Sequence, residues 1–197
     1  TIIEDCPVTG VTTESFGALV SGERVTGITT KLGDIQCDVV VNCCGQWARE
    51  FGALAGVNVP LVSVQHQYLV TQPIDGLSNN LPTLRDPDNL TYFKVDAGAL
   101  VMGGYEPQPI AWALDGIPDN FEFTLLDANW AHFEPFMEAA MARVPALREA
   151  GIRQLINGPE SFTPDGNFIL GEAPECSGYF VGAGFNAFGI ALGYWCA

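Results

Sequence analysis

The chain has few positive charges. Its 197 residues include 8 lysines and arginines against 23 aspartates and glutamates, which gives a formal net charge of −15. Binding to nucleic acid or to an anionic membrane surface depends on clustered lysine and arginine, because these side chains neutralise phosphate. The composition therefore argues against both kinds of partner. The acidity alone does not identify a substrate, since a solvated acidic surface explains it.

The chain also lacks the pattern of a zinc site or of a disulfide framework. Its two histidines, His66 and His132, lie far in sequence from the cysteines, and none of the six cysteines forms a CxxC pair. We therefore expect no metal site. Cys43 and Cys44 follow an apolar run and are most simply buried small hydrophobic residues. This cysteine usage favours a reducing compartment, either the bacterial cytoplasm or the mitochondrial matrix.

No uninterrupted apolar run reaches the roughly 18 residues of a transmembrane helix, so we expect no membrane insertion. Charged residues make up only 16% of the chain and hydrophobic residues 48%. This balance favours a packed globular protein over a disordered one. The length suits one large domain or two small ones.

The first third of the chain reads as strands separated by glycine-rich turns. Strands are predicted over residues 1–5, 11–14, 24–30 and 35–41. The run Val39–Val41 is typical of a central strand that is covered on both faces of a sheet. A helix is predicted over Trp47–Ala55, with Gly56 as its stop.

The middle of the chain has a different pattern. Strands are predicted over residues 62–71, 91–95 and 99–104, with Asp96–Gly98 as a hairpin turn between the last two. Residues 124–142 have the spacing of an amphipathic helix, in which Pro135 predicts a kink or two helical pieces. A further strand is predicted to end at Gly158–Pro159.

The last quarter contains a short strand that runs into glycines. Tyr179–Val181 is followed by Gly182, Gly184 and Gly189. Glycine lets the backbone approach a ligand closely, and a helix that starts there points N–H groups at negative charge. A nucleotide or flavin cofactor is held in this way. The spacing is not GxGxxG, so the pattern alone also fits an ordinary strand–turn–helix.

Several motifs together carry a resemblance to a known family. They are VVVNCCGQWARE (39–50), VQHQYLVT (64–71), LRDP (84–87), GGYE (103–106), GPESFTPDG (158–166), FILGEAPE (168–175) and GYFVGAGFN (178–186). In this order they resemble the flavin-dependent amine dehydrogenases of the sarcosine and dimethylglycine dehydrogenase family. That family lies within the D-amino-acid-oxidase-like FAD superfamily.

The resemblance implies an α/β plus α+β fold, in which a Rossmann-like FAD lobe is interrupted by an antiparallel-sheet substrate lobe. The lobes it predicts are a partial FAD-binding lobe over residues 1–61, a substrate lobe over 62–157 and a return to the FAD-binding lobe over 158–197. Family members open with a strand–GxGxxG–helix unit that holds the FAD pyrophosphate. This chain has no such motif, so we expect a truncated piece that is inactive alone.

The resemblance implies an FAD-dependent oxidoreductase that oxidises the C–N bond of an N-methyl amino acid such as sarcosine. The flavin performs the redox step, while the protein orients the amine and grips the carboxylate. Two alternatives stay open. Dimethylglycine is another possible substrate, and the chain could be a non-catalytic relative such as the regulatory subunit of pyruvate dehydrogenase phosphatase.

Candidate substrate residues follow from the same resemblance. Tyr105 and Tyr92 match substrate-side positions of monomeric sarcosine oxidases. His66 and Tyr68 lie two residues apart, on one face of a strand, and have the polar tips that such a pocket needs. Each of these residues could instead be half-buried and contribute only to packing. Arg85 could grip a carboxylate, although an arginine beside an aspartate is more often part of a surface ion pair.

Candidate FAD-binding residues also follow from the resemblance. Val8 matches a position whose backbone meets the adenine, and Gly45 and Trp47 match the loop near the adenosine half. For Trp47, core packing is the alternative. Gly158 matches the loop beside the flavin ring. The turn against the flavin and its ribityl chain is matched by Gly182, Gly184, Phe185, Gly189 and Ile190.

Overall fold

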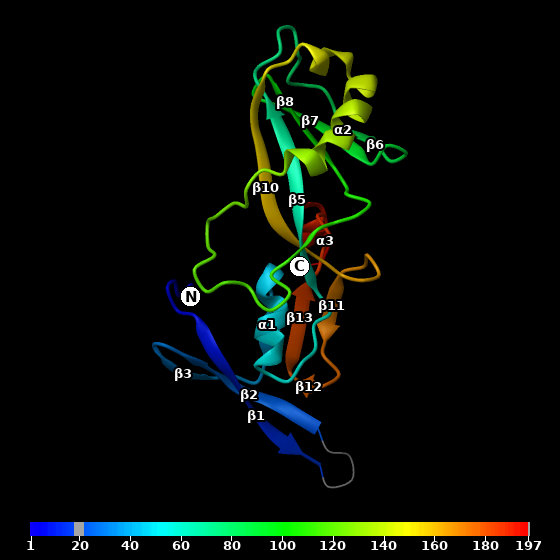
Figure 1. Cartoon of the computed structure of the whole chain (residues 1–197). Helices are drawn as coiled ribbons and strands as arrows, with labels where there is room; N and C mark the ends of the chain where they lie inside the picture. The colour runs from blue at the N-terminus through cyan, green and yellow to red at the C-terminus, as the bar shows by residue number, and fades with distance from the viewer. Residues whose placement is uncertain (18–21, 197) are drawn as a thin grey trace. The chain divides into compact units, whose positions relative to one another are not determined.

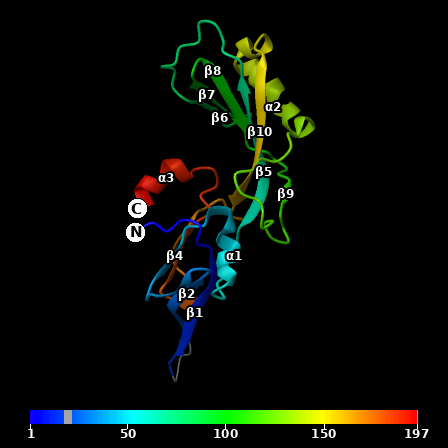
Figure 2. The ribbon, with the colours of Figure 1, turned by 90° about the vertical axis from the view of Figure 1, so that its left-hand side faces the viewer.

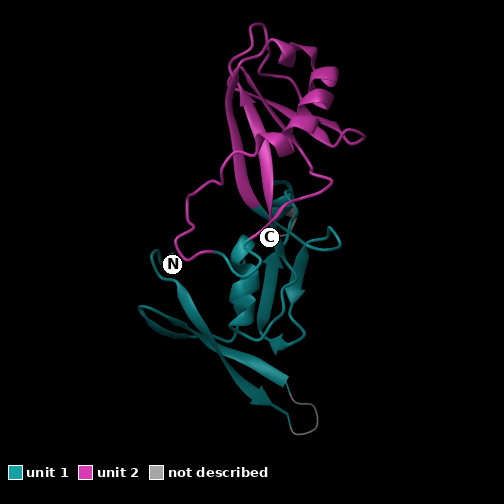
Figure 3. Cartoon of the chain, in the orientation of Figure 1, with its two compact units in different colours: residues 1–63, 113–117, 160–197 teal, residues 64–112, 118–159 magenta. Residues whose placement is uncertain are grey.

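The structure is a computed structural model that describes residues 1–17 and 22–196, with the side chains of residues 195 and 196 left out. The chain divides into two compact units (Figure 3). Unit 1 comprises residues 1–63, 113–117 and 160–197, and unit 2 comprises residues 64–112 and 118–159. Each unit has its own hydrophobic core and is described by itself.

Figure 1 labels most of the helices and strands, and Figure 2 also labels β4 and β9. In chain order they are β1 (Val8–Phe16), β2 (Gly22–Thr30), β3 (Gly33–Gln36), β4 (Val40–Asn42), η1 (Gly45–Trp47), α1 (Ala48–Ala53), β5 (Val62–Thr71), β6 (Leu84–Asp86), β7 (Thr91–Asp96), β8 (Ala99–Gly104), β9 (Ala111–Trp112), α2 (Trp130–Arg143), η2 (Pro145–Arg148), β10 (Ile152–Phe162), β11 (Ile169–Glu172), β12 (Cys176–Ser177), β13 (Tyr179–Ala183) and α3 (Gly189–Cys196).

Unit 1 contains two sheets. In the first, the strand order is β1-β2-β12, and β3 also pairs with β2. In the second, the order is β11-β13-β4, with β13 parallel to β4 and antiparallel to β11. Parallel strands end at the same edge of a sheet, so the loops that follow β4 and β13 leave this sheet side by side.

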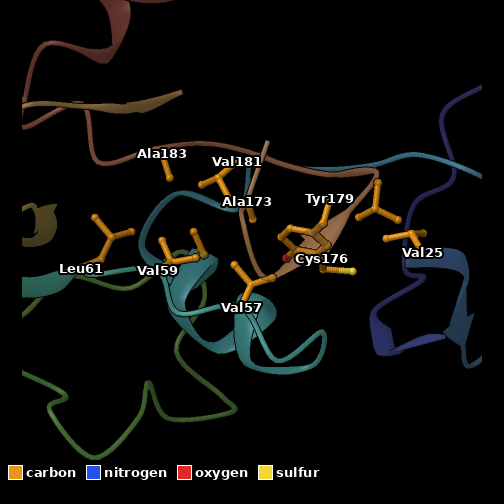
Figure 4. Close-up of a cluster of buried hydrophobic side chains, with 11 residues drawn as sticks. Val25, Val57, Val59, Leu61, Ala173, Cys176, Tyr179, Val181 and Ala183 are labelled. Atoms are coloured by element: carbon orange, nitrogen blue, oxygen red, sulfur yellow. The ribbon is translucent and has the colours of Figure 1, made fainter. Parts of the chain in front are cut away.

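A buried asparagine links the elements of unit 1. The Nδ2 atom of Asn42 donates hydrogen bonds to the Tyr179 hydroxyl at 3.0 Å and to the Ala48 carbonyl at 2.9 Å. Its Oδ1 atom accepts a hydrogen bond from the Cys44 N–H at 3.2 Å. Tyr179 is fully buried in the apolar cluster drawn in Figure 4, which also contains Cys176. One amide therefore holds β4, the start of α1 and β13 together.

Unit 2 is built on a sheet with the order β10-β5-β8-β7-β6, to which β9 adds at β5. Helix α2 covers one face of this sheet (Figure 2). Phe133 and Phe136 of the helix pack against Leu69 of β5 and Met102 of β8. Because successive strand residues point to opposite faces, the neighbours of Leu69 on β5 lie on the face away from α2.

The sequence predicted many of these elements correctly. Strands β5, β7, β8 and β13 lie at the predicted positions, and α1 follows β4 as expected. The turn between β7 and β8 is a two-residue hairpin turn in which Ala97 and Gly98 both take positive φ, 49° and 77°. That conformation matches the right-handed twist of the paired strands.

Two predictions in unit 1 were wrong. Residues 1–5 form no strand in the structure, and β1 begins at Val8. β-Branched residues favour an extended backbone, but a strand also requires a partner. The Val39–Val41 run is not a central strand, because β4 lies at the edge of its sheet. It is also not covered on both faces, because Val41 is 60% exposed.

The predictions for α2 and for β10 also need correction. Helix α2 begins at Trp130 rather than at residue 124, because the preceding segment extends along β10, where the Leu126 N–H donates to the Asn157 carbonyl at 2.9 Å. Pro135 lies within this one helix and does not divide it into two. Strand β10 continues through Gly158 and Pro159 to Phe162, so this segment is a strand and not a loop.

The short helix α3 has an unusual surface. It contains no charged residue, and Ile190 and Tyr194 are 103% and 85% exposed. Within the described part of the chain, no helix is both long enough and apolar enough to cross a membrane.

Replacement of Tyr179 by phenylalanine should lower the free energy of unfolding by about 1–3 kcal/mol, because the buried Asn42 amide loses a partner. Burial raises the pKa of Tyr179 to about 12. An unfolded tyrosine ionises near pH 10. A raised folded-state pKa stabilises the fold fully below about pH 10, and this contribution is lost as the pH rises toward 12.

Urea unfolding at about pH 8 and about pH 11 would test this expectation, since the two values lie on either side of the free tyrosine pKa. The wild-type chain should lose more stability between them than Tyr179→Phe does. Tyr194→Phe is the matched control, because Tyr194 is 85% exposed. Equal pH-dependent losses in the wild type and the Tyr179 variant would contradict the assignment.

Candidate functional site

The first candidate site is the carboxyl edge of the β11-β13-β4 sheet, defined here as residues 43–47 after β4 and 184–189 after β13. The parallel register pairs Tyr179 with Val40 and Val181 with Asn42. A Cβ atom at Gly182 would lie 3.3 Å from the Cys43 Sγ atom, which shows how closely the two segments approach. In open α/β sheets, ligands bind outside the carboxyl ends of the strands.

Most of the predicted cofactor residues lie at or next to this carboxyl edge. Two are elsewhere: Val8 begins β1 in the other sheet of unit 1, and Gly158 lies within β10 in unit 2. A Cβ atom at Gly158 would meet only the Leu125 side chain, at 3.8 Å. The residues that the structure brings together are Gly45, Trp47, Gly182, Gly184, Phe185, Gly189 and Ile190.

Asn186, which the sequence analysis did not single out, holds the loop after β13. Its Oδ1 atom accepts a hydrogen bond from the Thr163 N–H at 2.9 Å, and its Nδ2 atom donates to the Gly184 carbonyl at 2.7 Å. Asn186 and Ala187 take positive φ angles of 52° and 68°. This conformation is rare for alanine. Such strain persists where surrounding contacts impose it, and it clusters at ligand sites.

The carboxyl edge fits one part of a flavin cofactor. Gly45 has φ 57°, and a Cβ atom there would meet no atom within 4 Å, so its backbone is open on that side. The Phe168 and Phe185 rings stack with centroids 5.3 Å apart. The first turn of α3 has N–H groups without intrahelical partners and contains no acidic residue. Such donors and aromatic surfaces suit an aromatic ring system with carbonyl oxygens.

Packing within the protein requires glycine at position 184. Its φ is 69°, and a Cβ atom would lie 2.6 Å from the Thr163 Cγ2 atom and 2.8 Å from the Leu61 Cδ2 atom. Thr163 is held by Asn186, so it cannot move away without breaking that hydrogen bond. The lack of room at Gly184 therefore comes from the protein itself. Its closeness to a flavin remains a prediction.

The second candidate site lies on the face of the unit 2 sheet away from α2. The strand register places Tyr68 opposite Gly103, Gly103 opposite Tyr92, and Tyr92 opposite Arg85. These residues form one row across neighbouring strands. A Cβ atom at Gly103 would collide with the ring and hydroxyl of Tyr92, so the glycine lets this tyrosine lie across β8.

Tyr105 and His66 form the adjacent row. Their ring centroids are 5.4 Å apart, and the Tyr105 ring lies 6.1 Å from that of Tyr92. The guanidinium carbon of Arg85 lies 5.1 Å from the centre of the Tyr105 ring. We call this set, formed by His66, Tyr68, Arg85, Tyr92 and Tyr105, the tyrosine face. It contains every residue predicted to contact substrate.

Arg85 does not serve as the ion-pair partner of its neighbour in the sequence. Asp86 points to the opposite face of β6, where it accepts a hydrogen bond from the Arg143 Nε atom at 2.8 Å and one from Asn89. These partners hold the pKa of Asp86 below its usual range. The alternation of the strand therefore leaves Arg85 on the tyrosine face.

Glu106 was quoted in the GGYE motif, but the sequence analysis assigned it no role. Its side chain is 4% exposed, and its Oε2 atom lies 3.0 Å from the Nδ1 atom of His66. Its Oε1 atom accepts a hydrogen bond from the Gln67 N–H at 3.3 Å. The available signal was an acidic residue directly after an apolar strand, but the sequence did not show which residue it would meet.

Known proteins resemble the whole chain. A family model described as FAD dependent oxidoreductase (DAO) matches residues 1–197. Mitochondrial sarcosine dehydrogenase of Homo sapiens is 46% identical over 197 residues, which are 99% of this chain and 21% of that protein. The mitochondrial pyruvate dehydrogenase phosphatase regulatory subunit of Mus musculus is 40% identical over 184 residues, covering 92% and 21% of the two chains. The chain thus spans about a fifth of the length of these relatives.

A solved structure has the same fold. The crystal structure of L-proline dehydrogenase from P.horikoshii superimposes with a TM-score of 0.74 over 95% of this chain and 46% of that one, at 24% identity. At this identity the likeness shows the fold alone. The predicted fold class, mixed α/β with a Rossmann-like lobe, is confirmed.

Replacement of Gly184 by alanine should lower the free energy of unfolding by about 1–3 kcal/mol, because the added methyl group is forced into Thr163 and Leu61. Gly193→Ala is the control, since a Cβ atom there meets nothing within 4 Å. In a helix that change should be neutral or stabilise by about 0.5–1 kcal/mol. Chemical denaturation of both variants decides, and a Gly184 variant as stable as wild type would refute the packing argument.

Proposed function

Because the chain belongs to the family of FAD dependent oxidoreductases, we propose that it supplies a flavin-binding edge and a substrate-binding face to an enzyme that oxidises the C–N bond of an N-methyl amino acid. The observation that supports this most directly is the tyrosine face, where a guanidinium, an imidazole and three tyrosines lie on one side of the sheet. Sarcosine is the substrate we favour, given the 46% identity to sarcosine dehydrogenase.

The tyrosine face has the groups that a small N-methyl amino acid needs. The Arg85 guanidinium is exposed and can bind a carboxylate through two parallel hydrogen bonds. The rings of Tyr68, Tyr92 and Tyr105 offer apolar walls for the methyl group, with hydroxyl tips for the nitrogen. The His66 imidazole can accept a proton from the amine, and a neutral amine is the form that is oxidised.

FAD, when bound, accepts the two electrons and the hydrogen from the carbon next to nitrogen. On this chain, the carboxyl edge would hold it. Gly45 and Trp47 would lie against its adenosine half, and the segment from Gly182 to Ile190 against the flavin and ribityl chain. Val8 and Gly158 stay as further candidates outside that edge. We place the protein in the bacterial cytoplasm or the mitochondrial matrix.

The non-catalytic alternative rests on the 40% identity to a phosphatase regulatory subunit. The two functions are separated by a chimera in which this chain replaces the matching 197-residue segment of human sarcosine dehydrogenase. We expect the chimera to retain FAD and to oxidise sarcosine, with dimethylglycine as the comparison substrate. A chimera that binds FAD but oxidises neither amine would overturn the enzymatic proposal.

In that chimera, Tyr105→Phe should lower turnover of sarcosine by an amount equivalent to about 2–4 kcal/mol, because the ring stays while the hydroxyl that meets the amine is lost. The thermal unfolding temperature should hardly change. Steady-state kinetics and a melting curve on the same preparation check both points. Turnover within about twofold of that of the unmutated chimera corresponds to less than 1 kcal/mol of activation free energy. That result would mean that Tyr105 only lines the pocket and that its hydroxyl does not act on the amine.

Arg85→Gln should act mainly on substrate binding. Loss of a charge-assisted contact to the carboxylate should raise KM for sarcosine by about 10–100-fold, with a smaller effect on kcat. Arg153→Gln is the matched control, because Arg153 is an exposed arginine of the same unit. Equal KM values in the two variants would exclude Arg85 as the carboxylate partner.

A further inference from the structure

Glu106 and His66 form a nearly buried pair beside the tyrosine face. Their side chains are 4% and 10% exposed, and the Oε2 and Nδ1 atoms are 3.0 Å apart. The second carboxylate oxygen is bound by the Gln67 N–H at 3.3 Å. A carboxylate out of water is costly unless its oxygens accept hydrogen bonds. Both oxygens of Glu106 do so, one from a side chain and one from the backbone.

The contact determines which nitrogen of His66 carries a proton. An ionised carboxylate only accepts hydrogen bonds, so the Nδ1 atom that faces it must be the donor. In a neutral imidazole the other nitrogen, Nε2, is then the unprotonated one. The His66 ring lies 5.4 Å from that of Tyr105, which shares the tyrosine face with Tyr68 and Arg85.

We propose that Glu106 is a positioning residue that keeps a proton on the Nδ1 atom of His66 and so makes the Nε2 atom the acceptor of the proton from the substrate amine. Its effect on catalysis rests on the proposed function. The step moves one proton from the ammonium nitrogen of the substrate to His66 Nε2. The electron pair of the broken N–H bond stays on that nitrogen as the lone pair of the neutral amine, and His66 becomes an imidazolium. Glu106 itself does not touch the substrate and neither gives nor takes the transferred proton.

The strand that carries His66 is itself held in place. On the opposite face of β5, the Gln67 side chain accepts a hydrogen bond from the Asn129 N–H at 2.8 Å and donates one to the Asn129 carbonyl at 3.2 Å. The Gln67 backbone N–H binds Glu106. The carboxylate is therefore anchored to the same strand as the imidazole, which limits the positions that the ring can take.

The second histidine of the chain is an internal control with the opposite arrangement. The Nε2 atom of His132 lies 3.1 Å from the Gln108 carbonyl oxygen, and a carbonyl can only accept, so Nε2 must carry the proton. The Nδ1 atom of His132 is buried and faces no protein hydrogen-bond acceptor, so no contact requires a proton there. The two imidazoles should therefore hold opposite tautomers in the same sample.

Nitrogen NMR on the full chain with ¹⁵N-labelled histidine tests this directly. The spectrum is recorded at a pH high enough that both imidazoles give the signals of the neutral form, and His132→Gln assigns the signals. We expect a protonated Nδ1 in His66 and a protonated Nε2 in His132. In Glu106→Gln, the His66 preference should shift toward Nε2, whereas Glu138→Gln, an exposed change in the same unit, should leave both unchanged. A wild-type His66 protonated on Nε2 overturns the proposal.

The kinetic arm uses the sarcosine dehydrogenase chimera. Glu106→Gln should lower kcat by about 10–1,000-fold with little change in KM, since a misplaced general base slows chemistry rather than binding. Turnover equal to that of Glu138→Gln overturns a role in catalysis. If the unmutated chimera is inactive, the proposed function fails instead, and the tautomers in the NMR spectrum still decide whether Glu106 orients His66.

Discussion

The hydrogen bonds of Gln67 are the constraint on which the arrangement of unit 2 depends. This fully buried side chain exchanges hydrogen bonds with the backbone of Asn129 at the start of α2. The contact fixes β5 against the helix, and strand alternation then directs His66 and Tyr68 to the other face. A slip of one residue would reverse that assignment and bury the candidate site. The position of the polar residues thus follows from one buried amide.

Unit 1 uses the same device at its own site. Asn42 ties the end of β4 to Tyr179 and to the start of α1, and Asn186 ties the loop after β13 to Thr163. Each asparagine supplies hydrogen bonds where a loop leaves the carboxyl edge. A side-chain amide can donate and accept at once, so it can replace the missing strand partner of an irregular backbone. Both loops of the carboxyl edge are therefore held by a buried side-chain amide.

The sequence predicted which residues share the tyrosine face better than it predicted their partners. Resemblance identified Tyr92 and Tyr105, and the two-residue spacing placed His66 and Tyr68 on one face. Neither source assigned a role to Glu106, because its contact partner His66 lies 40 residues away in the sequence. Motifs report which residues a family keeps at a position, but they do not report which side chains meet across a sheet.

By itself, the sequence determined the family, the fold class, the main strands and the residue types of both candidate sites, since local periodicity and motif order contain that information. Only the tertiary structure decided that Asp86 pairs with Arg143 and leaves Arg85 beside Tyr105, and that Gly184 is crowded by Thr163. These contacts depend on strand register and on packing between distant segments. Strand register and packing are set by the free energy of the whole fold. A short stretch of sequence therefore cannot specify them.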